Sequence, residues 1–229
     1  MNTFRAIRIC HVVAFLLPVM VLARGALAAV GEVRDLKGEA TVTDGAGTQT
    51  LRRGMPVDVG QRIVTGPNAR VALQFADGTT VYLGEKTEFR VSAYRYAPQG
   101  WGGGAAFDLL RGVFRAVTGR IGEMQAPDFT VSTPVAVLGI RGTDFWGGFY
   151  FSDALDVAVF AGKGIYVQNS AGRVEIVEAG YGTTVRSANT PPEPPKRWGQ
   201  GKIDAAKRAV SLEETPVPTP KSGIGEEFY

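Results

Sequence analysis

Residues 129–145 read FTVSTPVAVLGIRGTDF, and this stretch decides the fold. A first strand is expected up to Thr133-Pro134, and an apolar run over residues 135–140 predicts a second. Residues 141–144, Arg-Gly-Thr-Asp, interrupt the run before it resumes at Phe145. Strands this short, separated by turns of this kind, are typical of an all-β protein.

The same pattern extends outward from about residue 30 to about residue 185. Residues 70–75 alternate apolar and polar side chains, Asp77-Gly78 predicts a tight hairpin turn, and residues 79–83 supply the partner strand. Ser170-Ala171-Gly172 predicts a second hairpin turn. The architecture is therefore expected to be a short-strand β-solenoid or a two-sheet sandwich. We favour the solenoid because further short strands could stack as its rungs, at residues 155–160, 164–168, 173–178 and 183–186.

The first 28 residues are interpreted as a secretory signal peptide. Basic residues come first, an almost wholly apolar run follows over residues 9–23, and Ala26-Leu27-Ala28 has the small residues of a cleavage site. Cleavage is expected after Ala28, with the mature protein in the periplasm or secreted. An uncleaved N-terminal anchor is the alternative, and no other stretch is long and apolar enough to span a bilayer.

Removal of this segment limits the chemistry of the mature chain. Cys10 and His11 are the only cysteine and histidine, and both lie within it. Thiolate and imidazole metal ligands and Ser-His or Cys-His catalysis are therefore not expected. We predict a protein that is not an enzyme and that has no metal or cofactor.

The charge balance argues against nucleic acid as a partner. The chain has 25 basic and 22 acidic residues, and three of the basic residues lie in the predicted signal peptide. The mature chain is thus balanced in charge and has no basic cluster longer than Lys196-Arg197. Nucleic-acid-binding domains usually present a basic face.

Several motifs in order resemble those of the FecR domain. The first is a glycine turn before an Ile-x-Thr segment, and an apolar hairpin ending in Asp-Gly comes next. Leu-x-x-Gly-x-apolar, Phe-x-Val-x-Thr-Pro and Arg-Gly-Thr-x-Phe follow, and a Gly-x-apolar-x-Val strand and an Ala-Gly turn close the series. These motifs correspond to residues 60–65, 73–78, 109–113, 129–134, 141–145, 164–167 and 179–180.

The resemblance implies an all-β extracytoplasmic domain that senses or scaffolds. The founding members of that family carry a cytoplasmic anti-sigma segment before a membrane-spanning helix. Because this chain has no room for such a segment before its signal peptide, a sigma-factor role is not expected. The chain is more similar to the free-standing secreted FecR-domain proteins.

The C-terminal part is expected to lie outside the domain. The FecR-like domain is assigned to residues 29–190, and the proline-rich residues 191–195 begin a linker and tail that end at residue 229. One short helix is predicted at residues 202–214. We favour disorder or weak docking for this tail, and docking on the domain or on a partner is the alternative.

Two groups of residues are candidates for ligand or partner binding. Arg141 and Thr143 could contact a ligand. Alternatively, Gly142 adopts an unusual backbone angle while Arg141 and Thr143 satisfy polar groups of the turn, and we favour this structural role. Trp101, in a glycine-rich loop, could stack on sugar rings or anchor a protein together with Tyr94 and Tyr96. The alternative for Trp101 is that it folds back on the sheet.

These features predict a non-enzymatic extracytoplasmic binding, scaffolding or sensing module that contacts another cell-envelope protein. An exposed aromatic patch or a free sheet edge is expected to make the contact. A module that binds the cell wall or a polysaccharide is the first alternative. A carboxylate-dependent hydrolase is the second, and no convergent polar cluster in the sequence supports it.

Overall fold

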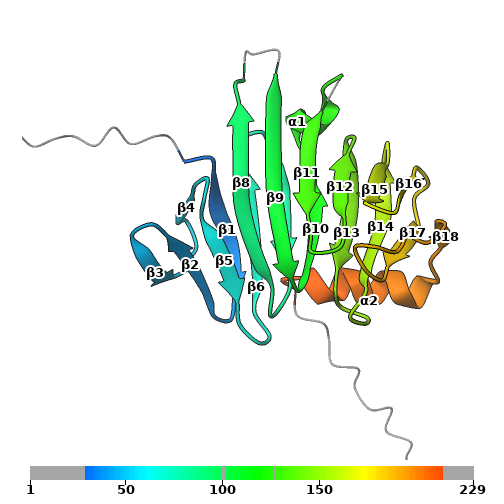
Figure 1. The fold of residues 1–229 in the computed structure, drawn as a ribbon. Helices are drawn as coiled ribbons and strands as arrows, with labels where there is room; N and C mark the ends of the chain where they lie inside the picture. The colour runs from blue at the N-terminus through cyan, green and yellow to red at the C-terminus, as the bar shows by residue number, and fades with distance from the viewer. Residues whose placement is uncertain (1–28, 99–101, 126, 214–229) are drawn as a thin grey trace, which may run out of the picture.

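The computed structural model describes residues 29–98, 102–125 and 127–213, and two nine-stranded sheets face each other in it (Figure 1). We call them sheet A and sheet B. Sheet A contains, in spatial order, β18 (Lys196–Arg197), β17 (Tyr181–Val185), β14 (Leu155–Gly162), β13 (Thr143–Gly148), β10 (Val113–Val117), β7 (Thr80–Leu83), β6 (Arg70–Phe75), β1 (Gly31–Lys37) and β4 (Pro56–Val57). Sheet B contains β16 (Gly172–Ile176), β15 (Ile165–Asn169), β12 (Val137–Ile140), β11 (Asp128–Ser132), β9 (Gly103–Arg111), β8 (Glu88–Tyr96), β5 (Arg62–Thr65), β2 (Ala40–Asp44) and β3 (Gly47–Thr50). The helices are α1 (Arg120–Glu123) and α2 (Gln200–Val210).

The chain crosses repeatedly between the sheets while advancing from one end of the sandwich to the other. Apart from the first strands, the strand order within each sheet follows the order in the sequence. The all-β prediction is confirmed, and the two-sheet sandwich is the alternative that the structure adopts. The favoured stacking of residues 155–186 as solenoid rungs is wrong, because β14 pairs with β17 in sheet A while β15 pairs with β16 in sheet B. Successive hairpins enter different sheets, so they do not lie on one another as rungs.

The predicted Asp77-Gly78 hairpin joins β6 and β7. Gln74 lies opposite Thr80, and Gly78 has a φ of +89°, a backbone angle that favours glycine in tight turns. The predicted turn at residues 170–172 also forms, since Asn169 lies opposite Gly172 between β15 and β16. Local turn chemistry was therefore sufficient to place both hairpins.

Phenylalanine rings from both sheets fill the space between them. Phe107 of sheet B contacts Phe75 of sheet A, with 5.1 Å between the ring centroids. Farther along, Phe114 and Phe145 of sheet A meet edge to face at 5.4 Å. These side chains are at most 3% exposed, so the interior of the sandwich is continuous and apolar.

Helix α2 covers the outer face of sheet A (Figure 1). Trp198, just before the helix, lies 5.9 Å from Trp146 between ring centroids, and Ala206 and Ala209 of the helix are buried in the same cluster. Trp146 is fully buried beneath α2. The disorder or weak docking favoured for the tail is wrong for α2, because its small buried side chains allow the helix to pack closely on the sheet.

An ion pair also holds the helix to the sheet. Lys202 Nζ of α2 lies 2.9 Å from Asp156 Oδ1 of β14, and the Asp156 side chain is only 3% exposed. The ammonium group also lies 4.1 Å from the centre of the Trp198 ring. The segment after the proline-rich residues therefore packs against the sandwich through both apolar and charged contacts.

Candidate functional site

The turn containing Thr143 is held by hydrogen bonds to the next segment of the chain. Thr143 Oγ1 donates to the Gly164 carbonyl at 2.8 Å and accepts from the Gly164 N–H at 3.0 Å. The Thr143 N–H in turn donates to Thr118 Oγ1 at 2.8 Å. Thr143 is 3% exposed, and Gly142 before it has a φ of +61°. Thr143 thus links consecutive crossings of the chain and is not accessible to a ligand.

A second turn in sheet B repeats this arrangement. Thr87 Oγ1 donates to the Val113 carbonyl at 3.1 Å and accepts from the Val113 N–H at 2.9 Å. Lys86 precedes it with a φ of +51°, and Phe89 lies two residues later in the core, as Phe145 does after Thr143. Lys86-Thr-Glu-Phe and Gly142-Thr-Asp-Phe are therefore structural equivalents on opposite sheets.

The acidic residue of each motif pairs with arginine on neighbouring strands. Asp144 accepts from Arg115 Nε at 2.8 Å and from its second guanidinium nitrogen at 2.7 Å. This pair raises the pKa of Arg115 above its usual value, chiefly through hydrogen bonding to Asp144. Glu88 lies 2.8 Å from Arg62 and 3.2 Å from Arg111. In both motifs the backbone conformation, the threonine hydroxyl and the carboxylate of the acidic residue thus stabilise the fold.

Arg141 differs from its neighbours in the turn because its side chain projects outward. Arg141 follows β12 and Lys163 follows β14, yet backbone hydrogen bonds bring the two segments together. The Arg141 N–H donates to the Gly164 carbonyl at 3.2 Å, and the Lys163 N–H donates to the Gly142 carbonyl at 3.1 Å. Both side chains are exposed. Neither forms a side-chain hydrogen bond or ion pair with the parts of the chain that the structure describes. Two cationic groups are therefore available at one place on the surface.

Arg141 and Lys163 border a groove on the outer side of sheet B. The groove has a volume of about 600 Å³ and runs between the α1 region and the strands β11, β12 and β15. Tyr166 lines the groove, and its ring packs closely against the backbone of Gly139, where an added Cβ would lie 2.0 Å from two ring carbons. Arg173 covers the same ring, with its guanidinium carbon 4.0 Å from the ring centre. We call this cavity the groove.

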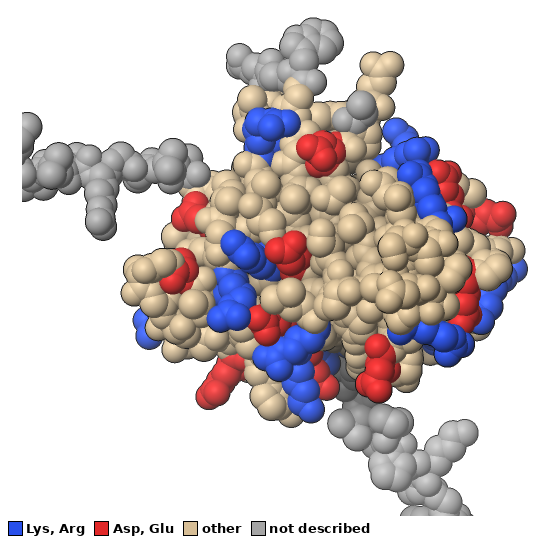
Figure 2. Space-filling view, in the orientation of Figure 1, with Lys and Arg blue, Asp and Glu red and all other residues tan. Residues whose placement is uncertain are grey.

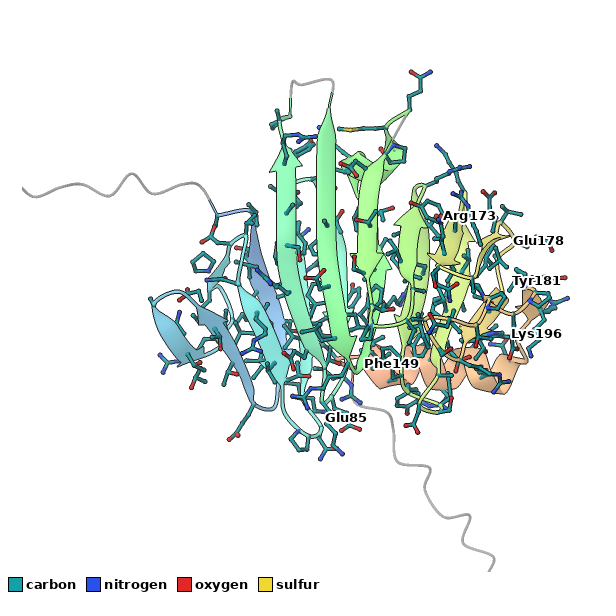
Figure 3. All side chains as sticks on the ribbon, in the orientation of Figure 1. Glu85, Phe149, Arg173, Glu178, Tyr181 and Lys196 are labelled. Atoms are coloured by element: carbon teal, nitrogen blue, oxygen red, sulfur yellow. The ribbon has the colours of Figure 1, made fainter. Side chains whose placement is uncertain are left out.

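The groove lies beside a part of the surface that carries few charges. Figure 2 shows a largely uncharged region right of centre, over β11 and β12, with basic and acidic side chains to its left, below it and along its right side. Figure 3 places Arg173 toward the end of the sandwich formed by β15 and β16. Glu123 and Asp128 also line the groove, so its cations face a mixed environment. Such a surface suits a partner segment that carries a carboxylate and presents an otherwise uncharged face.

Tyr94 is committed to an internal polar network. Its hydroxyl donates to Asp77 Oδ1 at 2.9 Å and accepts from the Asp77 N–H at 2.9 Å, while its ring stacks on Phe75 at 5.4 Å. Asp77, 4% exposed, also accepts from Thr79 Oγ1 at 2.8 Å and from the Ile121 N–H at 3.2 Å. Burial, and next the charge of Asp77, raise the pKa of Tyr94. The phenol thus joins the hairpin turn to β8.

The other two aromatic residues predicted to bind a ligand or partner, Tyr96 and Trp101, do not form a binding site together in the described part of the chain. Tyr96 is half-buried, packs against the core and lies 3.5 Å from an Arg120 guanidinium nitrogen through its hydroxyl. Trp101 lies outside the described residues. The binding roles assigned to Tyr94, Tyr96, Trp101, Arg141 and Thr143 stay predictions. The structure brings Arg141 and Thr143 into one turn and leaves only Arg141 exposed.

Lys163 and Tyr166 were not predicted as parts of this site. Lys163 is 22 positions from Arg141 in the sequence, and only the crossing of the chain places them together. The repeated Thr-acid-Phe motif is the sequence pattern that could have indicated Lys163. In each copy of the motif the threonine hydroxyl forms hydrogen bonds with the segment that next crosses the sandwich. That segment begins at Val113 for the first copy and at Gly164 for the second.

Within residues 29–98, 102–125 and 127–213, no group of three or more His, Cys, Asp or Glu side chains could hold a metal ion. No helix within the same ranges is both long enough and apolar enough to cross a membrane.

Residues 61–163 match the family model described as FecR protein. The matched segment contains both Thr-acid-Phe motifs and ends at Lys163. A comparison with curated proteins gives no significant match.

Among solved structures, two crystal structures described as "a putative anti-sigma factor" from Parabacteroides distasonis ATCC 8503 are similar to the chain. Each shares 17% sequence identity and a TM-score of 0.48 over 63% of this chain, and the match covers 63% of one and 62% of the other. The chain thus spans less than two thirds of either structure. A structure described as "Cell surface anchoring domain" matches 26% of this chain and 80% of its own, with 33% identity and a TM-score of 0.25.

Proposed function

The chain belongs to the FecR family through its domain at residues 61–163, and from this premise we propose that it is a non-enzymatic sensing or scaffolding module that binds another protein of the cell envelope. The groove beside the Arg141 turn is the proposed contact surface. The mature protein is proposed to act in the periplasm or after secretion, following cleavage at Ala28.

One observation carries this proposal: Arg141 and Lys163 have no side-chain hydrogen bond or ion pair within the described residues, and backbone hydrogen bonds hold both beside a groove. The hydrogen bonds that hold the turn come from Thr143 and from backbone groups, so the side chain of Arg141 is not required for them. An exposed cation beside a preformed cavity can pair with a carboxylate and direct its approach without much rearrangement. The expected ligand is therefore a protein segment that bears an acidic side chain.

The test is site-specific photocrosslinking in the native host. A photoreactive residue replaces Tyr166 or Lys163 in the full chain, and captured material is identified by mass spectrometry. Recovery of one envelope protein is the expected result, and recovery of muropeptides or polysaccharide in its place would favour the glycan-binding alternative. The absence of a specific adduct from both positions, with a folded protein, would contradict the groove as the contact surface.

Charge-reversal variants then test the role of the two cations. Arg141→Glu combined with Lys163→Glu is expected to lower crosslinking at Tyr166 at least severalfold, because both attractive groups become repulsive. Arg34→Glu combined with Arg208→Glu is the matched control, since it changes the net charge equally at exposed positions outside the groove. Equal losses of crosslinking at Tyr166 in the two double variants would show that binding depends only on the net charge of the protein.

The proposed location can be tested separately. N-terminal sequencing of the protein recovered from periplasm and culture medium is expected to begin at Ala29. A protein that retains residues 1–28 and sediments with membranes would support the anchor alternative.

A further inference from the structure

Four strands lie at the ends of the two sheets, and three of them carry features that oppose pairing with another strand. β4 has two residues and begins at Pro56, which has no N–H to donate. β18 has two residues, both basic. In β16, Arg173 pairs with Glu175, and the side chain of Asn169 fastens residues 187–190 alongside the hairpin. Charges, prolines, short length and covering segments are the usual protection of sheet edges.

β3 lacks this protection apart from its modest length. Its sequence is Gly-Thr-Gln-Thr, with no charge and no proline, and all four residues are exposed. Among the described residues β3 pairs only with β2, and it forms the outer edge of sheet B (Figure 1). Figure 3 shows Arg173 and Lys196 at the opposite end of the sandwich, so the two ends differ in how their edges are protected.

The backbone groups that β3 leaves free can be identified from the hairpin register. The Leu51 N–H donates to the Ala40 carbonyl at 2.8 Å, so the odd-numbered positions at this end of the strand direct their backbone groups toward β2. In an antiparallel pair the direction alternates from residue to residue. Thr48 and Thr50 therefore direct their N–H and C=O groups away from the sheet.

We propose that β3 pairs antiparallel with β3 of a second copy of this chain, about a two-fold axis at Gln49. Thr48 of each copy then lies opposite Thr50 of the other. Both are outward-facing positions, so the pairing forms about four backbone hydrogen bonds and joins the two B sheets edge to edge.

The charges around this edge are complementary in that register. β3 begins just after the turn beside Asp44 and ends at Thr50, shortly before Arg52 and Arg53. Antiparallel pairing therefore places the basic end of one copy toward the acidic end of the other. The backbone N–H of Ala46, followed by the Gln61 side chain, holds the pKa of Asp44 below its usual value, so this carboxylate is ionised at neutral pH. The two-fold axis produces this contact twice, which favours a second copy of the chain as the partner strand.

The interface is expected to be weak. A single pair of four-residue strands buries less surface than stable interfaces do. Association should therefore appear in the upper micromolar range and weaken with added salt, because the charged groups are exposed.

Sedimentation equilibrium of the mature chain, from micromolar to near-millimolar concentration, tests this proposal. Thr50→Pro removes an outward N–H from each copy, whereas Thr50→Val removes the same hydroxyl and keeps the N–H. The proline variant is expected to dimerise roughly 10- to 100-fold more weakly, from the loss of two hydrogen bonds, while the valine variant dimerises like the wild type. Both should unfold at the same midpoint, because an N–H that faces solvent can be replaced by proline on an edge strand.

Charge reversal provides an independent measurement. Arg53→Glu is expected to weaken the dimer and to abolish most of its salt dependence. A wild-type chain that stays monomeric at all concentrations would overturn the proposal, as would a Thr50→Pro variant that dimerises normally. A monomeric wild-type chain whose β3 edge instead crosslinks to another protein, and loses that adduct in Thr50→Pro, would show that this edge accepts a different strand.

Discussion

Replacing Thr143 by valine tests whether the Arg-Gly-Thr turn exists for the fold. Valine keeps the shape of the side chain and removes only the hydroxyl. The Gly164 carbonyl keeps a second donor, the Arg141 N–H at 3.2 Å, whereas the Gly164 N–H loses the acceptor that it has at 3.0 Å. The cost is therefore dominated by one buried, unsatisfied N–H group.

The expected loss of stability follows from the Gly164 N–H that Thr143→Val leaves without an acceptor. An unsatisfied buried donor costs roughly 1–3 kcal/mol, and a lost neutral hydrogen bond to the carbonyl about 1 kcal/mol, partly offset by the greater apolar character of valine. We expect Thr143→Val to lower the free energy of unfolding by about 2–3 kcal/mol, a fall in the melting temperature of roughly 4–12 °C for a domain of this size. Urea titration followed by tryptophan fluorescence measures it directly.

Thr87→Val supplies an internal check on this reasoning. The Val113 carbonyl likewise keeps a second donor, the Gly84 N–H at 2.9 Å, while the Val113 N–H loses its acceptor. The two variants should therefore lose similar amounts of stability, whereas Thr50→Val at an exposed position should change it by less than about 0.5 kcal/mol. A folded Thr143→Val protein of wild-type stability that no longer crosslinks to its partner would refute the structural role and assign Thr143 to binding.

Three further predictions concern other contacts. Tyr94→Phe should lower the free energy of unfolding at neutral pH, and the difference in this free energy from wild type should narrow above pH 10.0. The pKa of Tyr94 in the folded state is raised above that ordinary value, so above it the wild-type unfolded state releases a proton that the folded state retains, and the wild type loses stability. Denaturation measured as a function of pH checks this. Lys202→Ala should cost about 1–3 kcal/mol, because Asp156 stays buried without its cation, and hydrogen exchange in α2 should accelerate. Gly142→Ala should cost more than Gly78→Ala in thermal unfolding, since both have positive φ but only the first would bring a Cβ to 2.9 Å from a backbone oxygen.

The local parts of this fold could be predicted because they depend on neighbouring residues. The alternation at residues 70–75 gave β6 with its observed bounds, and Asp77-Gly78 gave its hairpin. The sheet that each hairpin joins depends on contacts between distant segments, such as the Thr87 hydroxyl with Val113. No local pattern encodes those contacts, which is why the sequence alone favoured a solenoid over the sandwich.

The docking of α2 was missed for a related reason. The helix buries small residues, Ala206 and Ala209, whose apolar character is weak in a sequence window rich in charged residues. Two of the aromatic rings in this contact belong to Trp198, which precedes the helix, and to Trp146, which is far away in the sequence. Amphipathic periodicity measures only the residues within a helix, so it underestimates docking of this kind.

Of the two cations in the candidate site, one could be predicted from the sequence and the other could not. Arg141 could be singled out because it stands beside a glycine turn, whereas Lys163 reaches it only through the crossing that Thr143 holds in place. Within this turn the fold and the proposed binding use different groups. The hydroxyl of Thr143 and the backbone of Gly142 stabilise the turn, and the guanidinium of Arg141 forms no hydrogen bond, ion pair or ring contact with the described chain. Stability measured on Thr143 variants and partner binding measured on Arg141 variants therefore report on separate properties of one short motif.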